Sequence, residues 1–274
     1  MRGPGGNKGK TVNSLLDPFI ALKIACAIVI VVTASRATER AGPFLGAMIA
    51  TLPVSTGPIY AFLAIDHGAQ FISDSALMGG AGVSATVAFI AAHALVAQRF
   101  SPPVSIAVAT ACWFGVALLL QLRAWNFVEA CALFAVCFAV AIRALRRFVV
   151  EGKVPPMPRV RFDLALRALL VACVVVATTI AGNAFGPAAT GVLATYPVVF
   201  TSLVLILQPR WGGPFVASLL VSALKGLIGF GIALGVLHLA AARISAGWAL
   251  AVALTVAVAW NGALLFARRR PAPV

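Results

Sequence analysis

The 274 residues are 62% hydrophobic and only 10% charged, with a mean hydropathy of +1.03. A soluble domain of this length needs far more polar surface to stay dispersed, so the composition excludes that class. The net charge of +14 would suggest nucleic acid in a soluble protein, but here Lys and Arg lie mainly between or at the ends of apolar runs, where they set orientation and meet anionic lipid. We therefore exclude nucleic acid as a partner.

Apolar runs of the length that a bilayer requires follow one another from Pro18 to Ala267. Such runs span a membrane only as helices, since the strands of a barrel would alternate polar with apolar residues. We expect an all-α, polytopic integral membrane protein with about nine transmembrane helices, after a disordered basic tail at residues 1–13. The expected spans are 18–34, 43–65, 76–97, 104–122, 127–149, 164–181, 187–207, 215–240 and 247–267.

The chain contains an internal repeat. Residues 42–54 return as 186–198, at an offset of 144 residues, with six of the thirteen positions identical. The same offset sets residues 21–23 against 165–167, and 75–79 return as 222–226, three residues later than the offset predicts. These matches indicate a duplication. Residues 14–124 and 161–270 are then two repeats of four helices, and residues 125–160 hold one unmatched helix and a linker rich in Pro and Arg.

The single unmatched helix between two repeats of four helices inverts the second repeat relative to the first, if every run spans. The positive-inside rule favours a cytoplasmic carboxyl terminus in a bacterial inner membrane, with 14 basic residues inside and 5 outside when Lys23 and Lys225 are excluded as lying within spans. A loop at 66–75, holding Asp66, His67 and Asp74, then lies outside. The alternative makes spans 43–65 and 187–207 re-entrant hairpins in parallel repeats, which would favour a channel-like pore.

Each repeat carries a proline deep inside a span. Pro43 and Pro187 fit the first turn of a helix, where a missing amide costs nothing. Pro53 and Pro197 fall ten residues later, about 15 Å along the axis, where a proline removes a hydrogen bond and clashes with the preceding turn. We therefore expect broken helices at 51–52 and 195–196. Paired interrupted helices at matching positions are typical of a transport site.

Hydroxyls and helix amino termini at the two breaks would favour an anionic or strongly hydrogen-bonding solute. The alternative is an ordinary proline kink whose Ser and Thr side chains bond back to their own backbone. The candidate substrate-binding residues at the breaks are Thr51, Pro53, Ser55, Thr56, Tyr60, Thr195, Tyr196, Pro197, Thr201 and Ser202.

Three ionisable residues within the spans are further candidates. Lys225 is the one formal charge deep in an apolar run, and it would supply a countercharge to the solute unless it snorkels to the surface. His93 and His238 lie near the ends of two spans and are candidates for proton coupling, with an ordinary interfacial role as the alternative.

Catalysis has few candidate residues in this chain. It has only seven Asp and Glu, no His-Glu-x-x-His, and no Gly-x-Ser-Gly, since Ala85 follows Gly82-Val83-Ser84. The five cysteines (Cys26, Cys112, Cys131, Cys137 and Cys173) lack metal-site spacing. We expect no enzyme, no metal and no cofactor; a non-transporting assembly or lipid-interacting subunit is the main alternative to a transporter.

Two stretches resemble known families of duplicated bacterial membrane proteins. Residues 43–50, Pro-Phe-Leu-Gly-Ala-Met-Ile-Ala, resemble the Pro-x-x-Leu-Gly-Ala-Met-x-Ala stretch of AbrB-type proteins. Residues 186–190, Gly-Pro-Ala-Ala-Thr, are similar to a Gly-Pro-Ala-Thr stretch of LrgB-type proteins. The resemblance implies a carrier or exporter.

These observations lead to one expected function. We expect a secondary carrier or exporter for a small polar, anionic organic solute, with its site where the two broken helices approach each other near mid-membrane. Its partners are the lipid bilayer and the solute, and self-association is left open.

Overall fold

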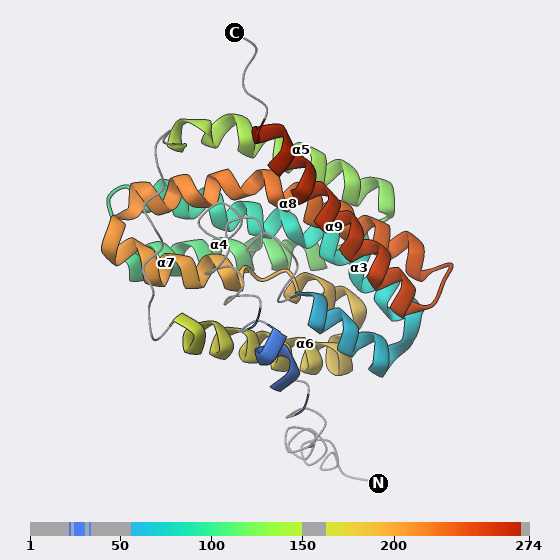
Figure 1. The fold of residues 1–274 in the computed structure, drawn as a ribbon. Helices are drawn as coiled ribbons and strands as arrows, with labels where there is room; N and C mark the ends of the chain where they lie inside the picture. Colours follow the sequence, from blue (N-terminus) through green and yellow to red (C-terminus); the bar gives the residue numbers. More distant parts are fainter. Residues whose placement is uncertain (1–21, 23–24, 31–32, 34–55, 150–162, 270–274) are drawn as a thin grey trace.

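The structure is a computed structural model that describes Leu22, Thr33 and residues 25–30, 56–149 and 163–269 (Figure 1). Leu22, Thr33 and residues 25–30 are helical, within the first expected span. The remaining helices are α3 (Thr56–Val96), α4 (Pro102–Gln121), α5 (Phe127–Leu145), a short 3-10 helix η1 (Arg146–Phe148), α6 (Asp163–Leu193), α7 (Val198–Trp211), α8 (Gly213–Ala241) and α9 (Ala246–Arg269).

The described helices have the length and composition of membrane spans. Six of them, drawn from α3, α4, α5 with η1, α6, α8 and α9, are long and apolar enough to cross a bilayer, and α7 is a shorter apolar helix. The chain is therefore a multi-pass membrane protein of the expected all-helical class. The expected linker between the repeats lies largely at 150–162, outside the described residues.

Three glycines reverse or bend the chain inside these apolar helices. Gly68, Gly186 and Gly212 have φ values of 81°, 78° and 79°, which a side chain would strain. Gly68 divides α3 into segments 56–67 and 69–96, Gly186 divides α6 at residue 186, and Gly212 separates α7 from α8. Gly68 and Gly212 are 144 residues apart, which is the offset of the sequence repeat.

The expected loop at residues 66–75 is wrong. Residues on both sides of Gly68 are helical, so Asp66 and His67 end one helical segment and Asp74 lies in the next. A single glycine with positive φ turns the chain without a loop, and the ring of His67 stacks on Phe71 across it at 4.1 Å. The polar residues had the composition of a loop but belong to helix ends.

The long segment of α3 and α8 form an antiparallel pair at the centre of the molecule. Gly213, at the start of α8, packs so closely on Ala97 that an added Cβ would overlap the Ala97 carbonyl oxygen. At the other end of the pair, Ser73 Oγ donates a hydrogen bond of 2.9 Å to the backbone oxygen of His238. These two helices are buried along most of their length, whereas α4, α5 and α9 are mostly exposed.

The turns gather at two ends of the helix bundle. At the first, which we call the Gly68 end, Gln121 Nε2 donates to the Ala188 oxygen just beyond Gly186, at 3.2 Å, and Phe127 stacks on His238 at 5.4 Å. At the second, the Gly212 end, Gln208 Nε2 donates to the Phe100 oxygen at 3.3 Å. Segment 69–96 of α3, α4 and α5 therefore run in alternating directions between the two ends.

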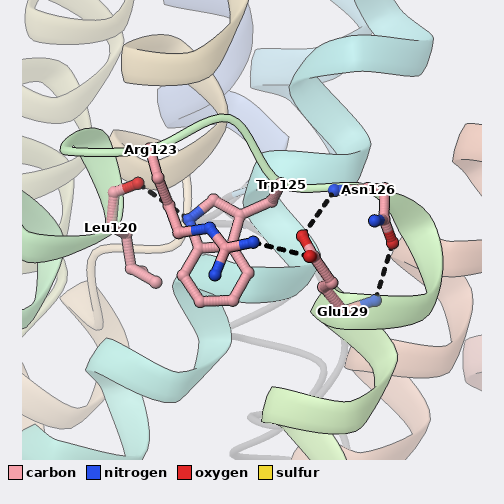
Figure 2. A network of polar contacts seen from close by, with 5 residues as sticks. All are labelled: Leu120, Arg123, Trp125, Asn126 and Glu129. Atoms are coloured by element: carbon pink, nitrogen blue, oxygen red, sulfur yellow. Dashed lines mark hydrogen bonds and ion pairs between the residues drawn. The ribbon is translucent and has the colours of Figure 1, made fainter.

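The turn between α4 and α5, at the Gly68 end, holds a network of polar contacts (Figure 2). Asn126 and Glu129 form a reciprocal capping box at the start of α5, with bonds of 2.9 and 3.2 Å. Arg123 pairs with Glu129 at 2.5 Å and lies over the ring of Trp125, whose Nε1 donates to the Leu120 oxygen. Trp and Arg together are typical of the headgroup level of a bilayer.

Candidate functional site

The second expected helix break is present. Helix α6 ends at Leu193 and α7 begins at Val198, so residues 194–197 interrupt an apolar run, as Pro197 predicted. Pro197 is the N-cap residue of α7 and makes no side-chain cap, which leaves this helix amino terminus without a capping side chain. The first expected break, with Thr51, Pro53 and Ser55, lies outside the described residues.

The break lies beside the middle of segment 69–96 of α3. A Cβ added to Gly82 would lie 2.8 Å from Thr195 Oγ1, and Thr86 Oγ1 donates to the Thr195 oxygen. Gly82 and Thr86 are near the centre of segment 69–96 of α3. If that segment spans the bilayer, the break is near mid-membrane, where freed backbone groups have no water to bond with.

Two threonines of α3 satisfy carbonyls that the break releases. Thr56 Oγ1 donates to the Ala194 oxygen at 3.1 Å, and Thr86 Oγ1 donates to the Thr195 oxygen at 2.8 Å. Both threonines are buried, and they come from the two segments of α3 on either side of Gly68. Hydroxyl donors thus replace the amides that a continuous helix would have provided.

Several predicted ligand hydroxyls bond to nearby backbone instead of facing an open site. Thr195 Oγ1 donates to Val192 O at 2.7 Å, Thr201 Oγ1 to Pro197 O at 3.0 Å, and Ser202 Oγ to Val199 O at 2.7 Å. Such bonds from Ser and Thr to their own backbone are those expected at an ordinary proline kink. Tyr60 is apart from this group, because its hydroxyl donates to the backbone oxygen of Ser75 at 2.9 Å.

Tyr196 is the side chain at the break with the loosest contacts. Its hydroxyl is 3.4 Å from both Thr110 Oγ1 of α4 and Thr201 Oγ1 of α7, the long limit of a hydrogen bond. Its ring stands edge-on to Trp113 of α4, with centroids 5.1 Å apart. Trp113 is fully buried, and within the described part of the chain its Nε1 has no hydrogen-bond partner.

Sequence reasoning missed Thr86, Thr110 and Trp113. None of the three lies within a stretch that the internal repeat matches, and none adjoins a proline, so no local pattern marks them. Their relevance comes from the packing of α3 and α4 on the break, which a sequence pattern does not encode.

Lys225 is not brought to the break. Its side chain is exposed on α8, and its backbone oxygen accepts a hydrogen bond of 2.9 Å from Trp260 Nε1 of α9. Among the described residues, no hydrogen bond or ion pair joins its ammonium to Thr195, Tyr196 or Thr201.

The two histidines link helices at opposite ends of the bundle. His93, fully buried near the end of α3, contacts Gln208 of α7 through Nε2 at 3.0 Å. His238, near the end of α8, contacts Ser73 of α3 through Nδ1, at 2.9 Å from its backbone oxygen and 3.0 Å from Oγ. His93 thus ties the end of α3 to α7 near Gly212, and His238 ties the end of α8 to α3 near Gly68.

Over the described ranges, no three His, Cys, Asp or Glu side chains come together, and we assign no metal ligand there. No protein-family model, curated protein or solved structure matches this chain. The resemblance to AbrB-type and LrgB-type proteins stays a prediction.

Proposed function

We propose that this chain is a membrane transporter, a secondary carrier or exporter of a small polar, anionic organic solute. The solute would bind at the break between α6 and α7. The observation that carries the proposal is this interruption of an apolar helix beside the middle of segment 69–96 of α3, where an uncapped helix amino terminus meets several hydroxyl groups. Non-helical backbone at membrane depth is tolerated mainly where it lines a cavity or is buried in protein.

The chemistry of the break supports an anionic ligand. The first amides of α7 carry the positive end of the helix dipole, and Pro197 leaves them without a side-chain cap. The indole Nε1 of Trp113 is a buried donor without a partner in the described structure. With the hydroxyls of Tyr196 and Thr110 close by, 3.4 Å apart, the site offers several donors and no fixed carboxylate among its contacts.

The arrangement of the two repeats supports alternating access. Segment 69–96 and α8 each follow a glycine of positive φ, and these glycines are 144 residues apart. The two helices run antiparallel, as equivalent helices of an inverted repeat would. In such carriers one repeat moves against the other around a central site.

The charges at the two ends support the proposed orientation. The Gly212 end carries the basic residues Arg99, Arg143, Arg146, Arg147 and Arg210. The Gly68 end carries Arg123 and Arg243 together with Asp66, Asp74 and Glu129. The positive-inside rule then assigns the Gly212 end to the cytoplasm of a bacterial inner membrane, and α9 would end on that side.

The test is uptake into proteoliposomes with a panel of radiolabelled small carboxylates and organic phosphates. We expect saturable uptake of at least one compound by the purified chain. Pro197→Ala and Trp113→Phe should each lower uptake at least about tenfold, because the first restores a continuous helix and the second removes the free donor. Trp248→Phe is the matched control, since Trp248 is 71% exposed on α9.

Normal uptake by both Pro197→Ala and Trp113→Phe would contradict a site at the break. Flux that does not saturate would favour the channel-like pore, and a chain that moves none of the compounds but co-purifies with a stable partner would favour the assembly subunit.

A further inference from the structure

An apolar groove lies between α3, α5 and α8, away from the break. Its volume is about 240 Å³, and its walls include Leu77 and Gly80 of α3, Phe127 and Phe134 of α5, and Gly235 and Leu239 of α8. Leu239 is exposed and Phe127 and Phe134 are half-buried, so the groove opens to the outer surface of the bundle. In a multi-pass membrane protein this surface faces lipid.

Glycines make the groove hollow. A Cβ added at Gly80 would meet no atom within 4 Å, and one added at Gly235 would make an ordinary contact of 3.6 Å with the ring of Phe127. The groove runs along α5 from Phe127 to Phe134, seven residues or about 10 Å of helix. It is therefore long and narrow enough for part of a hydrocarbon chain.

One end of the groove reaches the turn between α4 and α5. Phe127 is the first residue of α5, directly after the turn with Trp125 and Arg123 (Figure 2). On the other wall, Arg243 Nη1 lies 3.4 Å from the backbone oxygen of Leu239, so a guanidinium sits beside the mouth. Arg123 is already paired with Glu129, whereas Arg243 has no carboxylate partner within the described residues.

We propose that this groove binds an anionic phospholipid, with one acyl chain along Phe127 and Phe134 and the phosphate on Arg243. The apolar walls offer an acyl chain close contact without leaving polar groups unpaired. A guanidinium at headgroup depth forms charge-assisted hydrogen bonds with a phosphate. The site is separate from the break, so it stands whether or not the chain transports a solute.

Native mass spectrometry of the full chain tests the proposal. The protein is released from vesicles of phosphatidylglycerol and phosphatidylcholine in equal amounts, with identical acyl chains. We expect one retained lipid per protein, with phosphatidylglycerol preferred about fivefold over phosphatidylcholine. This preference is the effect expected of one basic residue near an anionic headgroup. Gly80→Leu should lower the occupancy at least about fivefold by filling the groove, and Arg243→Gln should keep a retained lipid but lose the preference.

Gly115→Leu is the matched control, because a Cβ at this glycine of α4 also meets no atom within 4 Å, and its occupancy should equal that of the wild type. Unchanged occupancy in Gly80→Leu, an equal loss in Gly115→Leu, or an unchanged preference in Arg243→Gln would each overturn the site. If Gly80→Leu does not fold, Gly235→Leu fills the same groove, and exposed Arg243 tests the headgroup contact independently.

Discussion

At the scale of single residues, the helix break is stabilised by hydroxyl groups that come from another helix. Thr56 and Thr86 belong to α3, yet their hydroxyls bond the carbonyls of Ala194 and Thr195. An unsatisfied carbonyl in an apolar interior is costly, so these side chains allow Pro197 to interrupt the chain without losing the fold.

The first prediction concerns Thr86. Thr86→Val keeps the shape of the side chain but removes the donor to the Thr195 oxygen, so we expect the free energy of unfolding in mild detergent to fall by about 1 kcal/mol. Thr255→Val is the control, because Thr255 is exposed and bonds only to Ala251 of its own helix. Equal stability of the two variants would show that the break does not depend on Thr86.

The second prediction concerns Lys225. Its side chain is exposed, and it lies twelve residues, or about 18 Å, along the axis from the start of α8. A lipid-facing ammonium at this depth is unfavourable by about 3 kcal/mol, so Lys225→Leu should stabilise the protein in a bilayer. The measurement is unfolding in vesicles, with Lys225→Arg as the control that keeps the charge. A destabilised Lys225→Leu, or one that folds but no longer transports, would assign the lysine a partner or a place in the solute path.

At the scale of helices, close backbone packing sets how α6 lies on α3. A Cβ on Gly191 would be only 2.0 Å from the Ser75 backbone oxygen and 3.0 Å from the Gly79 backbone nitrogen. Small residues at membrane helix interfaces allow backbones to approach in this way, because packing replaces the hydrophobic effect as the driving force. The contact lies just before the break, so it also positions residues 194–197.

The third prediction follows from that contact. Gly191→Ala should lower the free energy of unfolding by about 1–3 kcal/mol, since the Ser75 backbone must move to admit the methyl group. Gly115→Ala should be neutral or slightly stabilising, because it has open space and alanine favours helix. Thermal unfolding of both variants in detergent makes the comparison, and a neutral Gly191→Ala would argue against tight packing of α6 on α3.

At the scale of the whole molecule, the two ends of the bundle differ in charge, and this leads to the fourth prediction. In a variant without native cysteines, Arg243→Cys should react from outside the cell with a membrane-impermeant thiol reagent, whereas Arg147→Cys should react only after the cells are opened. The two arginines lie at the Gly68 and Gly212 ends and serve as each other's control. The reverse pattern would invert the orientation and place the carboxyl terminus outside.

Much of the fold could be predicted from the sequence, but the turns could not. Long apolar runs predict membrane helices because a bilayer leaves the backbone few alternatives. The cluster of Asp66, His67 and Asp74 predicted a loop, yet Gly68 alone turns the chain, since one residue with positive φ is enough. A lone glycine among 24 in the chain carries no local signal that distinguishes a turn from helix packing.

The candidate site could likewise be predicted only in part from the sequence. Pro197 and its repeat partner predicted the break, because proline cannot continue a helix wherever it falls in the fold. The deep lysine suggested a countercharge, but the structure has Lys225 on the outside of α8, which depends on how that helix is rotated. Trp113 and Tyr196 meet only because α4 packs beside the break.

The sequence by itself determined that this chain is helical and membrane-spanning, with a break expected at residues 195–196, because hydropathy and proline act through local chemistry. Only the tertiary structure decided which side chains satisfy the interrupted backbone, which donor is left free at the break, and where an apolar groove opens between α3, α5 and α8. Those features depend on contacts between helices distant in the chain, and the rotation and depth of each helix come from packing against its neighbours.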